Sequence, residues 1–270
     1  MMTDSITYDQ AAEAYDRLAP FYDSFTAGYA YDPWVAAIHL RVRALGAIGT
    51  RALDLACGTG TSTEQLIRRG YDVLGCDISD RMIEQAKRKF AEYAHAFHVA
   101  DMRELPDLGE FDLILCLDDA INYLLSEEEL AATFSGVARL LAPGGVFAFD
   151  VNSLLTYRTA FADVAVKEDD GVLLAWLGET AASFEAGTIG TARVEIFSER
   201  PDGLWERSSM RHVQRHHKQE ILTAALAAAG LRCAAILGQH PGARLEADVD
   251  ECRHIKAVYF AQHELGGRRG

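Results

Sequence analysis

Cysteine is scarce in this sequence, and long apolar segments are absent. Five of the 270 residues are cysteine and none stands in a C-x-x-C pair, so a disulfide scaffold, a structural zinc site and a thioredoxin-type centre lack support. No apolar run approaches the length that spans a bilayer, and the N-terminal MMTDSITYDQAAEAYD lacks the basic and apolar regions of a secretory signal. We therefore expect a cytoplasmic protein with no membrane partner, in which Cys57, Cys76 and Cys116 are small buried hydrophobes.

Basic residues are also outnumbered, by 40 acidic to 26 basic, which gives a net charge of −14. A surface this acidic repels nucleic acid through its long-range field. The one dense basic run, residues 207–218, alternates with Ser, Met, Val and His and is typical of a strand with a cationic face. We expect no nucleic-acid partner.

Strand-like and helical segments alternate over residues 51–151, and no repeat or low-complexity tract interrupts them. The apolar runs that predict strands are 51–55, 71–76, 95–99, 111–117 and 146–151; the segments that predict helices are 61–69, one beginning near Ser79, and 126–141. Ser126 and Glu129 have capping-box spacing, and the Pro-Gly-Gly run at 143–145 should break the chain. This alternation predicts a doubly wound α/β sheet that binds ligands beyond the carboxyl ends of its strands.

The flanking segments differ from this core. An aromatic-rich stretch at 8–45 predicts two helical segments, interrupted near Pro20 and Pro33. From about 164 to 216, alternating strands with Gly-containing turns predict an antiparallel insertion. We expect one domain over 1–270, divided into an N-terminal helical cover (1–46), a cofactor-binding core (51–151), an antiparallel lid (152–217), and a closing helix with two strands (218–262).

The loop after the first predicted strand reads Leu-Asp-Leu-Ala-Cys-Gly-Thr-Gly at 53–60. Gly58 and Gly60 allow backbone amides to approach a ligand closely. A dinucleotide fingerprint needs a third glycine, but Thr63 stands at that position, and no Walker lysine follows. The ligand predicted from this loop has a ribose but no phosphates.

Two carboxylates end the next two predicted strands. Asp77 can accept hydrogen bonds from both ribose hydroxyls; it could instead cap the next helix, although Ser79 and Asp80 are also available as caps. Asp101, in Val-Ala-Asp-Met, combines a carboxylate with apolar neighbours and so suits an adenine.

These motifs, followed in order by FDLILCLD and LLAPGGVFAFD, resemble those of class I S-adenosylmethionine-dependent methyltransferases. The resemblance implies a Rossmann-like seven-stranded sheet whose last strand is antiparallel, with S-adenosylmethionine as cofactor and S-adenosylhomocysteine as product. It also implies these cofactor contacts: Asp54 and the loop Ala56, Cys57, Gly58, Thr59 and Gly60 at the amino-acid part, Asp77 at the ribose, Ile78 and Met82 at the base, Asp101 and Met102 at the adenine, with Ala100 and Leu117 beside them. The N-terminal aromatics, the stretch DDAINYL and the insertion are similar to bacterial small-molecule and amino-sugar N-methyltransferases.

The methyl acceptor should lie past the fourth strand. Asp118 and Asp119 can orient or deprotonate an amine or hydroxyl, or one of them can merely cap a turn. Asn122 and Tyr123 follow as candidate substrate-binding residues, although a packing role for Tyr123 is equally open.

His212 alternates onto one strand face with Met210 and Gln214. If that face covers the pocket, His212 is a candidate general base with a pKa suited to neutral pH; otherwise it lies on a solvated strand edge. His216 and His217 point in opposite directions along a strand, so we predict no metal site.

Three aromatic side chains of the N-terminal cover can close over the sulfonium through cation–π attraction, or they can simply pack in the core. They are Tyr15, Tyr22 and Trp34, of which Tyr22 is favoured because Pro20 precedes it in an exposed turn.

The sequence therefore predicts an enzyme that transfers a methyl group to nitrogen or oxygen of a small-molecule metabolite, as a monomer or homodimer. A nicotinamide-dependent oxidoreductase and a non-catalytic S-adenosylmethionine-binding module are the alternatives. Methylation of RNA is disfavoured by the acidic charge.

Overall fold

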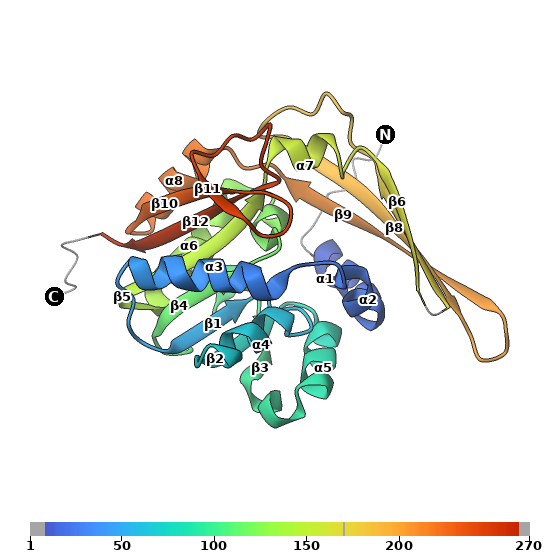
Figure 1. The fold of residues 1–270 in the computed structure, drawn as a ribbon, viewed down its shortest axis with the longest axis horizontal. Coiled ribbons are helices and arrows are strands. Elements are labelled where there is room, and N and C mark those ends of the chain that lie inside the picture. The colour runs from blue at the N-terminus through green and yellow to red at the C-terminus, as the bar shows by residue number, and fades with distance from the viewer. Residues whose placement is uncertain (1–8, 170, 265–270) are drawn as a thin grey trace.

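The computed structural model describes residues 9–169 and 171–264, whose strands form two sheets (Figure 1). The larger sheet has eight strands in the order β11-β10-β12-β5-β4-β1-β2-β3, and the smaller has four in the order β6-β7-β8-β9. The strands of the larger sheet are β1 (Arg51–Leu55), β2 (Asp72–Asp77), β3 (Phe97–Val99), β4 (Phe111–Cys116), β5 (Leu141–Asn152), β10 (Leu231–Gln239), β11 (Leu245–Ala247) and β12 (Lys256–His263). None of the helices in these ranges is long and apolar enough to cross a membrane.

Strands β1 to β5 are parallel, and helices connect them. These helices are α4 (Thr61–Arg68), α5 (Asp80–Lys89) with η2 (Ala91–Ala96), η3 (Met102–Glu104), and η4 (Ala120–Tyr123) with α6 (Glu127–Leu140). Because β1 pairs with both β2 and β4, the chain reverses direction across the sheet between these neighbours. The carboxyl end of β1 is therefore the switch point at which such sheets bind ligands. The predicted α/β fold is confirmed.

Two layers of apolar side chains cover the larger sheet. Alternate residues of a strand point to opposite faces, so Leu53 of β1 packs in one layer with Phe147 and Phe149 of β5, while Ala52 packs in the other with Val146. The predicted capping box is present, with Ser126 and Glu129 reciprocally bonded at the start of α6. The Pro-Gly-Gly run at 143–145 was expected to break the chain before the fifth strand. Instead it lies within β5, where the register of the pairing with β4 shifts.

The closing segment contains α8 (Gln219–Ala228) and three strands. β12 lies between β5 and β10 and is antiparallel to both, as the resemblance implied. The expected number of seven strands is too low, because the short β11 pairs with the end of β10 and extends the sheet.

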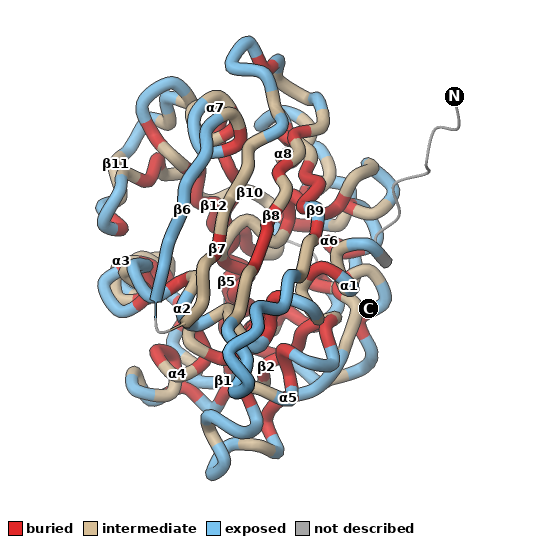
Figure 2. The backbone as a smooth tube through the Cα atoms, turned by 90° about the vertical axis from the view of Figure 1, so that its right-hand side faces the viewer, coloured by how far each residue is buried: buried red, intermediate tan, exposed pale blue. Residues whose placement is uncertain are grey.

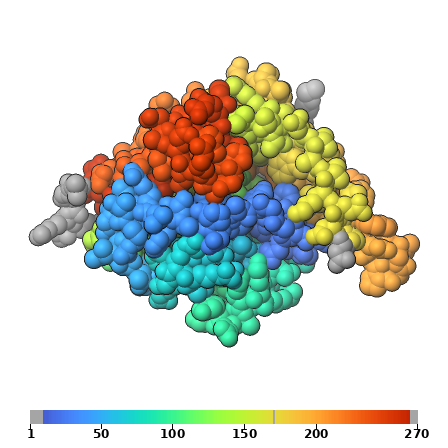
Figure 3. Space-filling model, in the orientation of Figure 1, coloured from blue at the N-terminus to red at the C-terminus, as the bar shows by residue number. Residues whose placement is uncertain are grey.

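The N-terminal segment consists of α1 (Asp9–Leu18), η1 (Ala19–Phe21), α2 (Tyr22–Thr26) and α3 (Tyr31–Ala44). The helix breaks near Pro20 as expected, but Pro33 does not interrupt a helix. It lies in the first turn of α3, where a backbone N–H has no helical partner to lose. Figure 3 shows these helices, in blue, as a band below the red C-terminal segment that reaches the yellow strands of the second sheet on the right. Tyr8, included in the predicted helical stretch, lies outside the described residues.

The predicted antiparallel strands are confirmed as a separate sheet of β6 (Val164–Asp169), β7 (Val172–Gly178), β8 (Ile189–Glu199) and β9 (Trp205–Arg215), preceded by α7 (Leu154–Arg158). Edge strand β6 is exposed along its length, whereas β8 and β9 carry buried residues (Figure 2). Leu174, Val194 and Met210 pack against Leu18 and Tyr22 of the N-terminal helices. The second sheet is therefore held onto the core largely through those helices.

Gly178→Ala should destabilise the join between the two sheets. A Cβ on Gly178 would lie 2.3 Å from the carbonyl oxygen of Phe161, and this backbone is itself held because that oxygen accepts a hydrogen bond from Thr180. Backbone must shift, so we expect a loss of about 1–3 kcal/mol in the free energy of unfolding. Gly28→Ala is the matched control, since its Cβ would meet nothing within 4 Å. Equal denaturant midpoints for the two variants would contradict the described packing.

Candidate active site

The loop after β1 turns sharply into α4. Ala56, Gly58 and Gly60 all have positive φ angles, of 59°, 54° and 85°, a region that non-glycine residues rarely adopt. Asp54 lies beneath this loop, where its Oδ2 accepts hydrogen bonds from Ser62 and Thr63 at 2.7 and 2.6 Å. Burial raises the pKa of Asp54 to about 6, although the two hydroxyls oppose this shift. Asp54 thus anchors the loop to the first turn of α4.

Asp77 ends β2 and faces the same loop. Its two oxygens accept backbone hydrogen bonds from Gly58 and Ser79, both at 2.9 Å, and burial raises its pKa to about 6. The cap of α5 is Ser79, whose hydroxyl accepts from the N–H of Met82 at 3.1 Å. Asp77 is therefore not needed as a helix cap, and its carboxylate is held at the carboxyl edge of the sheet.

A first cavity opens above this edge, and most of the residues predicted to bind the cofactor line it. They are Tyr22, Ala56, Cys57, Gly58, Thr59, Asp77, Ile78, Met82, Ala100, Met102 and Leu117. Asp54 and Gly60 do not line the cavity; Asp54 anchors the loop to α4, and Gly60 ends the loop as the N-cap residue of α4. Tyr22, from the N-terminal cover, lies above Gly58, since a Cβ added there would meet the Tyr22 ring at 3.5 Å.

Asp101, predicted to hold the adenine, does not line the first cavity, although its neighbours do. Its carboxylate accepts from the Nε and Nη2 atoms of Arg103 at 3.0 and 2.7 Å, and it caps η3 through the backbone N–H of Arg103. Arg103 also contacts Glu129 of α6 at 2.8 Å. No local pattern predicted that Arg103 would bind this carboxylate. The neighbours of Asp101 in the chain, Ala100 and Met102, do line the cavity.

The N-terminal helices are bonded across the first cavity. Asp23 accepts from the Thr59 hydroxyl at 2.6 Å and pairs with Lys89 at 2.8 Å, while Asp16 accepts from the Ser79 hydroxyl at 2.6 Å. These contacts join the cover to the two loops that surround Asp77.

A buried ion cluster lies past β4, where three carboxylates share one lysine. Lys256 Nζ lies 3.0 Å from Asp118, 2.6 Å from Asp119 and 2.9 Å from Asp150. Asp118 and Asp119 both have positive φ angles, and their backbone N–H groups donate to the Asp150 carboxylate at 2.7 and 2.9 Å. Asp150 therefore imposes a strained turn that presents the other two carboxylates.

The charges in this cluster do not balance. Burial raises the pKa of Asp119, Lys256 opposes this shift, and the charges of Asp118 and Asp150 add to it, so that the pKa is about 6. Burial alone would lower the pKa of Lys256, but the three carboxylates outweigh burial and raise it well above its usual value. The lysine stays charged and an excess of negative charge remains. The sequence reasoning missed both Lys256 and Asp150, although a lysine within the apolar strand Ile-Lys-Ala-Val was an available signal.

A second cavity adjoins the first. Tyr15, Tyr22, Asp118 and Tyr123 line both cavities, while Asp119, Lys256 and His212 line only the second. Its remaining walls are rich in aromatic and apolar side chains, among them Phe25, Tyr29, Trp34, Phe161 and Trp176.

His212 is in the second cavity's wall and not on a solvated strand edge. Burial lowers its pKa to about 4, so the expectation of a pKa near neutrality is corrected and the ring is uncharged at pH 7. Tyr123 lies beside it, with its hydroxyl 2.7 Å from Nδ1. Asn122, also expected to bind substrate, lines neither cavity. Its amide donates to the carbonyl of Arg215 and accepts from the N–H of Asn152, which ties β9 to β5.

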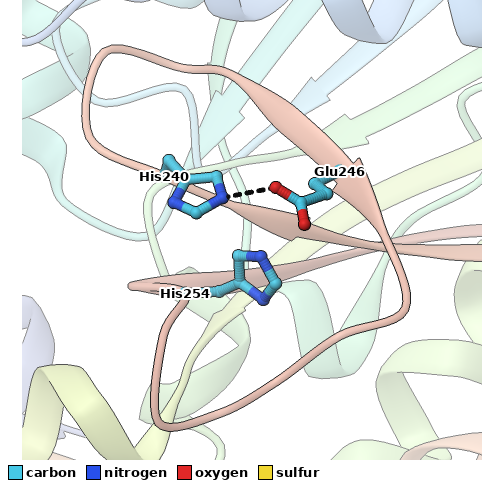
Figure 4. A group of neighbouring side chains, drawn as sticks. All are labelled: His240, Glu246 and His254. Atoms are coloured by element: carbon cyan, nitrogen blue, oxygen red, sulfur yellow. Dashed lines mark hydrogen bonds and ion pairs between the residues drawn. The ribbon is translucent and has the colours of Figure 1, made fainter.

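A separate cluster of His240, Glu246 and His254 lies near the end of β10, where three potential metal-ligand atoms fall within 4.8 Å of one another (Figure 4). Glu246 already bonds to His240 at 2.8 Å and lies 3.4 Å from Arg253. His254 Nδ1 accepts from the N–H of Asp250, which leaves the ring proton on Nε2, whereas a metal needs an unprotonated nitrogen. The hydrogen bonding favours an ion-paired cluster over a metal site.

Comparison with known proteins agrees with the fold. Residues 52–145 match the methyltransferase domain family. The chain carries a methyltransferase domain.

Two proteins similar to this chain differ in how much of it they match. The Bacillus subtilis (strain 168) protein YqeM is 34% identical over 158 residues, covering 58% of this chain and 62% of that relative. The chain thus spans less than two thirds of that relative's length. A Streptomyces venezuelae protein named dTDP-3-amino-3,4,6-trideoxy-alpha-D-glucopyranose N,N-dimethyltransferase is 28% identical over 223 residues, covering 79% of this chain and 90% of that relative.

Solved structures cover nearly the whole methyltransferase chain. An S-adenosylmethionine-dependent methyltransferase from Clostridium acetobutylicum ATCC 824 superposes with a TM-score of 0.76 at 26% identity, covering 92% of this chain and 98% of that one. DesVI from Streptomyces venezuelae superposes with a TM-score of 0.73 at 25% identity, covering 91% and 98%. The N-terminal helices and the second sheet therefore belong to the shared fold, and the resemblance predicted from the motifs is confirmed.

Proposed function

We propose that this methyltransferase transfers the methyl group of S-adenosylmethionine to an amine nitrogen of a small molecule. The observation that carries the proposal is the junction of the two cavities at Tyr15, Tyr22, Asp118 and Tyr123. A cofactor in the first cavity and an acceptor in the second would meet there, and alignment of the two reactants is the main requirement of this reaction.

The first cavity suits an adenosine that carries no phosphate. Asp77 can accept ribose hydroxyls, Ile78 and Met82 offer apolar surface to a base, and the loop at 56–60 supplies backbone groups to the amino-acid part. A nicotinamide dinucleotide fits poorly, because Thr63 replaces the glycine that permits close packing beside a pyrophosphate. A relative named as an N,N-dimethyltransferase and a superposed structure named as an S-adenosylmethionine-dependent methyltransferase also support this cofactor over a dinucleotide.

The second cavity suits an amine. Three carboxylates against one lysine leave negative charge that attracts an ammonium group. An ammonium cannot attack, so it first gives a proton to a carboxylate, for which Asp119 is placed. The nitrogen lone pair then forms a bond to the methyl carbon as the carbon–sulfur bond breaks and its electrons go to sulfur. A cofactor-binding module without catalysis would have no use for this proton acceptor.

The acceptor that we propose carries no diphosphate. Among the described residues lining the second cavity, Lys256 is the sole lysine or arginine, and three carboxylates already surround it. A diphosphate would therefore find no counter-charge there. The acceptor that we propose therefore differs from the dTDP-linked amino sugar for which one relative is named.

Asp119→Asn tests the acceptor half of the proposal. Removing the proton acceptor should lower kcat by about 100-fold, a typical contribution of general base catalysis, while cofactor affinity stays within about threefold. Transfer of labelled methyl to a panel of primary amines and calorimetric titration with S-adenosylmethionine measure the two quantities. Asp72→Asn, an exposed change on β2, is the control. Full turnover in Asp119→Asn would exclude this residue as the base, and no methylated amine with the wild-type chain would exclude the function.

We also propose that the enzyme works in the cytoplasm, as a monomer or homodimer. Its three buried cysteines are all free thiols, which suits a reducing compartment.

A further inference from the structure

A hydrogen-bond network in the second cavity determines the position of the proton on His212. Gln214 holds a fixed orientation, because its Oε1 accepts from Asn152 and Tyr157 at 3.0 and 3.2 Å. Its amide nitrogen donates to Asp119 at 2.5 Å. The NH₂ group of Gln214 can therefore only donate a hydrogen bond to its other neighbours.

Tyr123 comes next in the network. Its oxygen accepts from the hydroxyl of Tyr15 at 3.0 Å, and both Tyr15 and Gln214 act on its pKa in the lowering direction, as donors to a phenol oxygen do, although burial raises that pKa overall. The proton of Tyr123 then has one remaining partner, Nδ1 of His212 at 2.7 Å. Nδ1 accepts, so the uncharged ring carries its proton on Nε2.

This Nε2–H has no partner. It is one of the buried side-chain polar atoms that lack a hydrogen bond within the described residues, and His212 is only 3% exposed. The ring is fixed in place between Trp176, stacked on it at 5.7 Å, and Tyr15, edge-on at 5.4 Å. A buried N–H without an acceptor costs about 1–3 kcal/mol, so its retention calls for an explanation.

Two more residues of the same cavity share this property. Trp34 Nε1 and Gln239 Oε1 are also buried without partners, and both residues line the second cavity with His212. Three of the seven buried polar atoms without a partner among the described residues therefore belong to residues around this one cavity, although most of its walls are apolar.

We infer that His212 is a binding residue whose Nε2–H donates a hydrogen bond to an oxygen of the methyl acceptor. The inference rests on the proposed function and narrows its substrate class. The acceptor is an amine that also carries a hydroxyl or carbonyl oxygen, with the nitrogen toward Asp118 and Asp119 and the oxygen toward β9. His212 takes no proton in the reaction, because its only unprotonated nitrogen is occupied by Tyr123.

Two matched probe amines test the inference: 4-aminocyclohexanol and cyclohexylamine, compared by kcat/KM for methyl transfer from S-adenosylmethionine. The wild-type chain should prefer the hydroxylated amine. In His212→Phe that preference should fall by about 10- to 100-fold, the range for an acceptor whose site loses its hydrogen-bond partner. His212→Gln, whose amide can replace the Nε2–H, should recover much of the preference. His212→Asn, with a shorter side chain, should not.

Further measurements distinguish a hydrogen-bond donor at position 212 from a general base and from a residue that only stabilises the fold. Should His212→Phe fail to fold, the contrast between His212→Gln and His212→Asn decides the matter, with thermal unfolding and cofactor affinity measured for both. The titratable groups that contact the His212 ring are Tyr15 and Tyr123, and burial raises the pKa values of both. The pH profile of kcat/KM between 6 and 9 should therefore keep its shape in His212→Gln. If the fall in kcat/KM at low pH disappeared in His212→Gln, His212 would be assigned as the base instead and the inference would be overturned. An unchanged preference for the hydroxylated amine in His212→Phe or His212→Asn would also overturn the inference, but it would leave the proposed amine methylation intact. If the wild-type chain methylated neither amine, both the proposed function and the inference would be contradicted.

Discussion

Binding of S-adenosylmethionine should weaken by about 100-fold or more in Asp77→Asn. The carboxylate holds the N–H groups of Gly58 and Ser79 and can still accept two ribose hydroxyls, and hydrogen bonds to a charged group contribute about 1.5–3 kcal/mol each. The asparagine keeps the shape but has one acceptor oxygen, and its NH₂ group faces backbone donors. Calorimetric titration at pH 7.5 measures the difference, with Asp72→Asn as the control on the same strand.

The pH dependence of this affinity follows from the raised pKa of Asp77, about 6. The ionised carboxylate is the form that accepts both ribose hydroxyls, so protonation competes with the cofactor. Affinity of the wild-type chain should be constant above about pH 7 and fall by up to about tenfold per pH unit below pH 6. Asp77→Asn should show no such fall. If the affinity of Asp77→Asn for the cofactor stayed within threefold of the wild-type value, the placement of the ribose beside Asp77 would be contradicted.

Lys256→Met should destabilise the folded chain by about 3–5 kcal/mol at pH 7.5, the cost of removing one partner from a buried ion pair. Methionine fills a similar volume, so the loss reports charge more than packing. Asp118, Asp119 and Asp150 then remain buried without a cation. Denaturant unfolding measures the change, and Lys218→Met, at an exposed position, is the control.

The sign of the pH effect distinguishes charge from packing in this variant. Without Lys256, the folded-state pKa values of Asp119 and Asp150 rise further above their unfolded values, so the folded state binds protons more tightly than the unfolded state. The free energy of unfolding should therefore increase as the pH falls from 7.5 toward 5, and part of the loss should be recovered. A deficit that is equal at both pH values would indicate that the lysine stem, not its charge, stabilises this site.

The sequence was sufficient for the order of strands and helices and for most of the first cavity. Those features depend on local patterns: apolar runs, the Gly58–Gly60 loop and the capping box of Ser126 and Glu129 are each readable over a few residues. Position at a strand's carboxyl end is also readable, and it placed Asp77 and Asp118 correctly at the edge of the sheet.

Side-chain partners from distant segments could not be read in this way. Asp101 precedes Arg103 by two residues, but only the fold shows that the arginine turns back onto it and onto Glu129. Lys256 reaches Asp118 and Asp119 because β12 inserts beside β5, a pairing that no local pattern encodes. The pKa of His212 likewise depends on helix α1 and strand β7 packing around it.

The bonds from Asp16 and Asp23 to the core have a kinetic consequence. A methyl donor is used once and must then be exchanged, and helices α1 and α2 lie across its cavity. If the chain has the proposed function, we expect each catalytic cycle to include a step in which these bonds break, the spent donor departs and the helices close again over a fresh one. An amine that receives two methyl groups must wait through that exchange between the first and the second.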